Sequence, residues 1–282
     1  MPRTAPPPDT QIAFIGGGHM ARSLIGGLVR TGVAAADLRV GEPNAELAAA
    51  LVRDFGVAAG ADNDEAVVAA GTWVLAVKPQ ATHAVCTSLR AAAQERAPLV
   101  ITVAAGIRTD QIESWLGGGI AVVRAMPNTP ALIGAGATGL FATAQVDARR
   151  RAIAERVLGA VGLTAWIADE ALMDTVTAVS GSGPAYFFLL VEALEEAGVA
   201  GGLPRDTARG LAIRTCLGAG RMLAEDEATE PAELRRRVTS PGGTTQAALD
   251  SFTADGFAAI VARAIDAATR RGRELSAHFG DE

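Results

Sequence analysis

The sequence is poor in cysteine, histidine and tyrosine. Its 282 residues contain two cysteines, three histidines and one tyrosine. Cys86 and Cys216 lie far apart and show neither a metal-binding nor a redox spacing, so we expect no disulfide scaffold and no zinc site. We therefore predict that the protein holds no metal.

Long apolar runs and an excess of basic residues are missing as well. The uncharged segment Thr175–Val191 contains serine, glycine and proline, and it is too short and too polar to cross a bilayer. The net charge is -6, and the basic groups Arg149–Arg151 and Arg235–Arg237 fit solvated helix faces. We predict a cytoplasmic protein that binds neither nucleic acid nor a membrane.

The apolar content is high enough for a large core. Hydrophobic residues make up 49% of the chain and charged residues 20%, and the length favours two domains. The proline-rich segment Met1–Thr10 lacks the apolar region of a signal peptide, so we predict a disordered tail over residues 1–10.

Strands and helices alternate in the first half of the chain. Ile12–Ile15 is a short apolar run, three glycines follow it, and Met20–Arg30 has helical apolar spacing. Further strands are predicted at Leu38–Val40, Trp73–Val77, Leu99–Val103 and Ala121–Ala125, with a helix at Ala45–Phe55. This alternation predicts an α/β fold, with a Rossmann-type parallel sheet and helices on both faces over residues 11–168.

After Ala168 the strand signals largely vanish and long helical patterns take over. The predicted helices are Tyr186–Ala197, Arg205–Glu225, Glu230–Val238, Thr245–Phe252 and Phe257–Leu275. We predict an all-α C-terminal domain over residues 169–282.

A glycine-rich turn joins the first strand to the first helix. Gly16, Gly18 and Ala21 fit the pattern G-x-G-x-x-G/A, which lets the backbone approach a pyrophosphate at a helix N-terminus. The predicted cofactor site therefore includes Gly16, Gly17, Gly18, His19 and Met20. A glycine-rich turn without a ligand is the alternative.

Glu42, just after the second strand, bears on the choice of dinucleotide. An acid at this point favours a free ribose 2′-hydroxyl, whereas a nearby arginine accepts a 2′-phosphate. No arginine directly follows Glu42, so the residue type favours NADH, provided that Glu42 does not simply face solvent. Both NADPH and NADH stay open.

Three more segments are candidates for the nicotinamide side. Val77, Lys78 and Pro79 close a strand at the edge where open α/β sheets bind ligands, although Lys78 also fits a surface lysine. The small Ala104 and Ala105 would let a ring lie against the backbone. Asn128 lies in a loop stiffened by two prolines, which either shapes the nicotinamide pocket or is only a connector.

Two glycine-rich breaks interrupt the helical region. The residues Ser180–Pro184 favour a helix terminus that faces cofactor or substrate over a packing feature. The residues Ser240–Thr245 expose successive backbone N–H groups before a helix, which suits a carboxylate, although an ordinary helix–helix turn is the alternative.

Five segments together resemble the pyrroline-5-carboxylate reductase family. They are Gly16–Ala21, Ala76–Gln80, Arg124–Pro130, Ser180–Tyr186 and Thr239–Thr245, and the resemblance covers about Gln11 to His278. It implies reduction of 1-pyrroline-5-carboxylate to L-proline by hydride transfer from a nicotinamide dinucleotide, the final step of proline biosynthesis. It also implies a dimerisation role for the helical domain and assembly of dimers into rings, up to a decamer of dimers.

The resemblance also implies roles for single residues. Thr245 is expected beside the ring nitrogen as the catalytic hydroxyl, and the amides of Gly243 and Thr244 are expected on the carboxylate. Ser240, Gly242 and Glu170 complete the implied substrate site. Asn63 matches a position used at the adenosine ribose, although as a residue it equally fits a helix N-cap.

The reaction makes modest chemical demands. A protonated imine is already a strong electrophile, so the protein mainly holds two molecules in reactive geometry. We hypothesise that Thr245 orients the imine and relays a proton with water. A hydroxyacid or prephenate dehydrogenase would need a lysine or histidine on the helical domain, and Asp169–Glu282 contains only His278. A regulatory protein that senses the dinucleotide is a third reading.

Overall fold

The computed structural model describes residues 11–278, so the predicted tail at residues 1–10 lies outside the described residues. The chain forms two compact units. One takes in the chain up to Gly181 together with the residues from Ala268 on, and the other is Ser182–Ala267. The domain limits at residues 168 and 169 stay a prediction.

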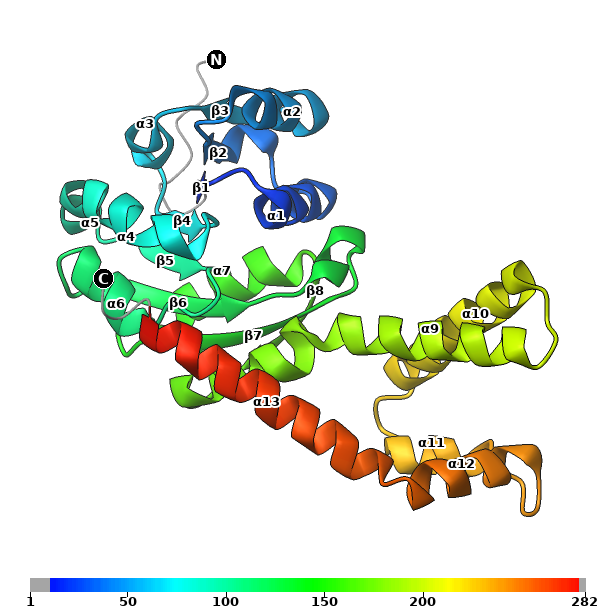
Figure 1. Cartoon of the computed structure of the whole chain (residues 1–282). Helices are drawn as coiled ribbons and strands as arrows, with labels where there is room; N and C mark the ends of the chain where they lie inside the picture. Colours follow the sequence, from blue (N-terminus) through cyan, green and yellow to red (C-terminus); the bar gives the residue numbers. More distant parts are fainter. Residues whose placement is uncertain (1–10, 279–282) are drawn as a thin grey trace. The chain divides into compact units, whose positions relative to one another are not determined.

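Within the described residues, the first unit contains an eight-stranded sheet in the order β3-β2-β1-β4-β5-β6-β7-β8 (Figure 1). The first six strands run parallel, β7 is antiparallel to β6, and β8 is parallel to β7. The strands are β1 (Ile12–Ile15), β2 (Leu38–Gly41), β3 (Ala58–Gly60), β4 (Thr72–Leu75), β5 (Leu99–Thr102), β6 (Ala121–Met126), β7 (Gly136–Ala142) and β8 (Gly162–Trp166). The order 3-2-1-4-5-6 is that of a dinucleotide-binding Rossmann sheet.

Alternate residues of the central strands pack into two separate cores. Ile12 and Phe14 of β1 face one core, and Ala13 and Ile15 face the other. All four residues are fully buried because helices cover both faces of the sheet. These helices are α1 (His19–Arg30), α2 (Ala45–Phe55) and α7 (Ala148–Gly159) on the first core, and α3 (Asn63–Val67), α4 (Pro79–Ser88), α5 (Arg90–Arg96) and α6 (Thr109–Trp115) on the second.

Short elements lie between the strands and after the last of them. The 3-10 turn η2 (Ala35–Asp37) precedes β2, and η3 (Thr129–Ile133) joins β6 to β7. The 3-10 turn η4 (Glu170–Leu172), the helix α8 (Met173–Val176) and the π-helix η5 (Thr177–Gly181) follow β8 and lead to the second unit. A π-helix inside a helical run often marks a functional segment.

The second unit is helical throughout. It contains α9 (Gly183–Ala200), α10 (Arg205–Glu225), α11 (Pro231–Arg237), α12 (Thr244–Ala254) and the first half of α13 (Phe257–His278). Glu195 of α9 forms ion pairs with Arg205 and Arg209 of α10, which fastens these two helices together. The bounds of these helices confirm the helices predicted for this region to within a few residues.

The expected α/β fold class is confirmed, with three additions. The expected strands appear as β1, β2, β4, β5 and β6. The sequence patterns missed β3, β7 and β8, and β7 breaks the expected all-parallel arrangement.

Candidate active site

The glycine turn lies where the strand order reverses, between β1 and β4. Gly16 has φ +96°, and a Cβ added to it would lie 2.8 Å from the carbonyl oxygen of Ala76. Its N–H donates to the carbonyl of Gly41, at 2.8 Å. Only glycine fits this backbone, because a side chain is strained at positive φ and has no space here. The turn therefore brings the ends of β1, β2 and β4 together.

The N-terminus of α1 leaves its first N–H groups available to a ligand. Gly18 is the N-cap residue, no side chain caps the helix, and its first turn contains no acidic residue. A Cβ added to Gly18 would meet nothing within 4 Å, so this end of the helix borders open space. His19 is exposed and Met20 is half-buried. Uncapped N–H groups and the helix dipole suit an anionic pyrophosphate.

Glu42 does not face solvent. It is 9% exposed, and its carboxylate accepts one hydrogen bond from the Gly17 N–H, at 2.7 Å, and one from the Asn44 N–H, at 2.8 Å. Asn44 in turn caps α2. The side chain of Glu42 therefore lies against the glycine turn, at the end of β2.

Asn63 lies beside the same strand end. The N-cap of α3 is Asp62, whose carboxylate accepts from the Asp64 N–H at 2.8 Å, so Asn63 does not cap the helix. The Oδ1 atom of Asn63 is buried without a hydrogen-bond partner among the residues described. A Cβ on Gly41 would lie 2.2 Å from this oxygen. A buried acceptor without a donor is costly, so it fits a hydroxyl supplied by a ligand.

The predicted nicotinamide residues follow β4 and β5. Val77 packs against the glycine turn, since its Cγ1 would lie 3.0 Å from a Cβ on Gly16. Lys78 is the exposed N-cap residue of α4, and Pro79 is the first residue of that helix. Ala104 is buried and Ala105 is exposed. These residues therefore line the same edge of the sheet as the glycine turn.

Asn128 connects three segments through both ends of its amide. Its Nδ2 donates to the carbonyl of Ser180, and its Oδ1 accepts from the Ala137 N–H, each at 3.0 Å. A Cβ on Gly181 would lie 2.6 Å from the Cε of Met126, so this loop and the π-helix are in close contact. The structure gives Asn128 a positioning role, and its contact with the nicotinamide stays a prediction.

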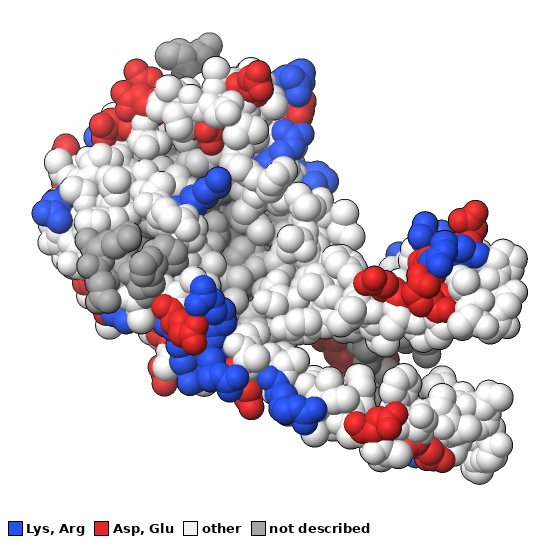
Figure 2. Space-filling view, viewed as in Figure 1, with Lys and Arg blue, Asp and Glu red and all other residues white. Residues whose placement is uncertain are grey.

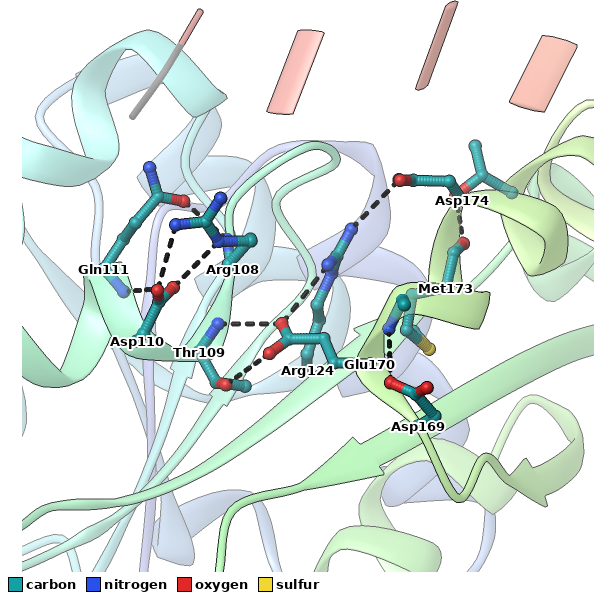
Figure 3. A network of polar contacts seen from close by, with 11 residues as sticks. Arg108, Thr109, Asp110, Gln111, Arg124, Asp169, Glu170, Met173 and Asp174 are labelled. Atoms are coloured by element: carbon teal, nitrogen blue, oxygen red, sulfur yellow. Dashed lines mark hydrogen bonds and ion pairs between the residues drawn. The ribbon is translucent and has the colours of Figure 1, made fainter. Parts of the chain in front are cut away.

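Glu170 takes part in a buried polar network that the sequence did not reveal (Figure 3). Its carboxylate accepts from the Thr109 N–H at 2.8 Å and from the Thr109 hydroxyl at 2.6 Å. Arg124 lies 3.2 Å from Glu170 and 3.5 Å from Asp174, and its side chain is only 6% exposed. This network connects β6, α6 and α8. A role for Glu170 at the substrate stays a prediction.

The loop Ser240–Thr245 lies in the second unit. Gly242 has φ +70°, and the Gly243 N–H donates to the carbonyl of Ser240 at 3.0 Å. Gly243 is the N-cap of α12, which begins at Thr244 without a side-chain cap or an acidic first turn. Thr245 is half-buried, and its hydroxyl makes no hydrogen bond within the described part of the chain. The N–H groups at the start of α12, from Thr244 on, are thus open to a carboxylate, whereas the expected Gly243 N–H is already bonded to Ser240.

Known proteins resemble both parts of the chain. Residues 170–275 match the family described as pyrroline-5-carboxylate reductase dimerisation, and residues 11–106 match NADP oxidoreductase coenzyme F420-dependent. A pyrroline-5-carboxylate reductase of Pseudomonas aeruginosa is 52% identical over 270 residues, which cover 96% of this chain and 98% of the relative. The chain belongs to the pyrroline-5-carboxylate reductases.

Solved structures agree with this membership. A pyrroline-5-carboxylate reductase from Coxiella burnetii is 42% identical with a TM-score of 0.92, over 94% of this chain and 98% of that one. The reductase from Plasmodium falciparum with NADP bound is 26% identical with a TM-score of 0.80, over the same shares.

Membership confirms the expected activity. The protein is an NAD(P)H-dependent pyrroline-5-carboxylate reductase, which forms L-proline by hydride transfer from a nicotinamide cosubstrate in the final step of proline biosynthesis. Its helical part is a dimerisation domain. The dehydrogenase and sensor alternatives are thereby set aside.

Two further features of residues 11–278 concern metal ions and membranes. No group of three or more His, Cys, Asp or Glu residues among them is arranged to hold a metal ion. By length and composition, one helical run, Glu170–Ala200, is apolar enough to cross a membrane, with mean hydropathy 1.2 and 11% of its most apolar stretch buried. This run lies inside the family's dimerisation domain.

Proposed function

We propose that the edge of the sheet formed by the ends of β1, β2 and β4 holds the dinucleotide. The observation that carries this proposal is the uncapped N-terminus of α1, which borders open space directly behind the glycine turn. The N–H groups of Gly18, His19 and Met20 bind the pyrophosphate, while Gly16 and Gly17 shape the turn. Glu42 and Asn63 bind the adenosine ribose.

The nicotinamide lies further along the same edge. Val77, Lys78 and Pro79 approach its ribose, and Ala104 and Ala105 leave room for the ring. Asn128 holds the loop that borders the ring through its bonds to Ser180 and Ala137. When bound, the dinucleotide supplies the hydride that reduces the C=N bond.

The substrate carboxylate is held by the turn that opens α12. Gly242 takes up the left-handed backbone of the turn, and the uncapped Thr244 amide at the start of α12 binds the anion next to Ser240. The Gly243 amide joins it only when it leaves the Ser240 carbonyl. Thr245, whose hydroxyl has no partner among the described residues, orients the imine nitrogen. Glu170, a carboxylate paired with Arg124, is proposed as a further substrate-binding residue.

Thr245 also moves a proton. The carbon of the protonated imine accepts a hydride and becomes saturated, and the nitrogen keeps its proton as a neutral secondary amine. The hydroxyl of Thr245 hydrogen-bonds this nitrogen and passes it a proton from water, which gives the ammonium form of the product. No strong acid is needed, because the iminium is electrophilic before it binds.

Substitution of Thr245 tests this role. We expect Thr245→Val, which keeps the shape and loses the hydroxyl, to lower kcat/KM by about a hundredfold. Thr244→Val is the matched control. It removes the hydroxyl of the neighbouring, exposed residue and keeps its backbone amide, so we expect little change in kcat/KM. If Thr245→Val and Thr245→Ala both keep full kcat/KM, the proposed role is wrong.

The assembly and location belong to the same proposal. Large apolar residues of α9 are exposed in the single chain, with Phe187 60% and Phe188 69% exposed, and a second copy would cover them. We propose a dimer, assembly of dimers up to a decamer of dimers, and a cytoplasmic location. In this proposal the dinucleotide-binding domain is residues 11–168 and the helical domain is residues 169–282. Light scattering measures the mass of the assembly.

Neither nucleic acid nor a membrane is a proposed partner. On the face shown in Figure 2, basic and acidic residues form small mixed groups, and no continuous basic surface is seen. The net charge is -6. Because Glu170–Ala200 lies inside the dimerisation domain, burial in a dimer explains its apolar surface without a membrane.

A further inference from the structure

The backbone donors at the end of β2 are already used. The Glu42 N–H donates to the carbonyl of Gly60 at 2.8 Å, Pro43 has no N–H, and the Asn44 N–H donates to the carboxylate of Glu42. The Gly17 N–H opposite them donates to the same carboxylate. None of these four positions has a backbone N–H left to donate a hydrogen bond to a phosphate placed here.

The charge at this place is negative as well. Glu42 takes part in no ion pair among the described residues, so its charge is not neutralised by an arginine or lysine. Of the arginines on the flanking helices α1 and α2, Arg22 and Arg53 are both paired with Asp54, and Arg30 lies in the last turn of α1. A 2′-phosphate would therefore meet an uncompensated carboxylate that two N–H groups hold in place.

A ribose hydroxyl fits the same place well. A free 2′-hydroxyl donates a hydrogen bond, and both Glu42 and the buried Oδ1 of Asn63 are acceptors. A phosphate at neutral pH accepts and carries about two negative charges. The end of β2 thus offers acceptors to a ligand that must donate.

We propose that Glu42 makes this reductase select NADH over NADPH. The inference rests on the proposed function in one respect, the placement of the adenosine ribose at the end of β2. The carboxylate excludes the 2′-phosphate in two ways, by repulsion and by taking up the N–H groups of Gly17 and Asn44. We expect kcat/KM to favour NADH by at least about tenfold.

Arg39, in β2, has no carboxylate partner in the described ion pairs. Its Nε is buried without a hydrogen-bond partner, and it lines a small pocket with Asp62 and Glu65. The pocket thus brings together one basic and two acidic side chains. The variant Arg39→Gln is therefore a useful control, and we expect it to leave the preference for NADH unchanged.

Two substitutions of Glu42 separate charge from turn geometry. Glu42→Gln removes the charge, and Glu42→Asp keeps it on a shorter side chain. Damage to the turn lowers the affinity for both dinucleotides alike, so the NADH to NADPH ratio of kcat/KM is the readout. We expect Glu42→Gln to lower this ratio about tenfold to a hundredfold, and Glu42→Asp to keep most of it.

A binding measurement without turnover completes the test. Calorimetry compares AMP with adenosine 2′,5′-bisphosphate, which differ only in the 2′-phosphate, at low salt and at about 1 M salt. We expect AMP to bind more tightly, with a smaller difference at high salt because the repulsion is screened. Equal or tighter binding of the bisphosphate to the unaltered enzyme would overturn the inference. Failure of both ligands and of both dinucleotides to bind would instead overturn the proposed dinucleotide site.

Discussion

Arg124 provides the sharpest test of what holds the first unit together. Its guanidinium lies between Glu170 and Asp174, and the exposed fractions of the three side chains are 6%, 18% and 13%. Helix α13 passes close to this place, since a Cβ on Gly272 would lie 3.3 Å from the Cβ of Asp174. Removal of the arginine would leave two carboxylates facing each other away from water.

We expect Arg124→Ala to lower the free energy of unfolding by about 3 kcal/mol. Loss of one partner of a buried ion pair costs roughly 3 to 5 kcal/mol. The low end applies here, because Glu170 keeps its two hydrogen bonds from Thr109. Arg124→Lys keeps the charge, but a single ammonium group cannot bond both carboxylates as the forked guanidinium does. We therefore expect it to lower the free energy of unfolding by about half as much.

Urea unfolding at one fixed protein concentration measures this effect, since a dimerisation domain makes stability depend on concentration. The control is Arg271→Ala, which removes an ion pair with Glu274 whose side chains are 66% and 62% exposed. We expect that control to cost no more than about 0.5 kcal/mol. If Arg124→Ala falls within the same range, the network does not stabilise the fold and our reasoning is refuted.

Two more predictions concern titratable groups. Hydrogen bonds from Arg209 foremost, and from Arg205, hold the pKa of Glu195 below its ordinary value of 4.5. Their stabilisation is therefore complete above pH 4.5 and is lost as the pH falls through the lowered value, so the gap in urea stability between the unaltered protein and Arg209→Gln should close in acid. A gap that stays constant in acid contradicts this. Burial raises the pKa of the Cys86 thiol to about 12. The variant Cys216→Ser leaves Cys86 as its one thiol, so it should show no fast reaction with Ellman's reagent until denaturant is added. Rapid labelling of the folded variant would contradict this burial.

Much of the sheet could be predicted because its central strands are buried on both faces. Strands such as β1 and β5 then appear as short continuous apolar runs between glycines and helices. β7 contains two glycines and a threonine, and β8 alternates between half-buried and exposed residues, so neither has that pattern. Their place in the sheet depends on pairing with distant residues.

The candidate site divides in the same way. The glycine turn was predictable because its function depends on local backbone freedom at Gly16 and on the helix that follows. The direction of Glu42 was not predictable, since it depends on the Gly17 N–H, which lies 25 residues away in the chain. Arg124 gave a weak signal as the only charge in an apolar strand, and Glu170 and Asp174, four residues apart, provided its partners.

Several residues predicted to bind ligands also hold the backbone, and this decides how they must be tested. Truncation of Asn128 would leave the Ala137 N–H and the Ser180 carbonyl unpaired, at about 1 to 3 kcal/mol each. A loss of activity in such a variant would therefore not show that the side chain contacts the nicotinamide. For Glu42 and Glu170 the same ambiguity applies, since each accepts hydrogen bonds from backbone N–H groups. For Glu42, the NADH to NADPH ratio of kcat/KM resolves this, because damage to the turn lowers both values alike and cancels in the ratio. For Glu170, an increase in KM at unchanged stability would indicate contact with the substrate, and a loss of stability alone would indicate a positioning residue.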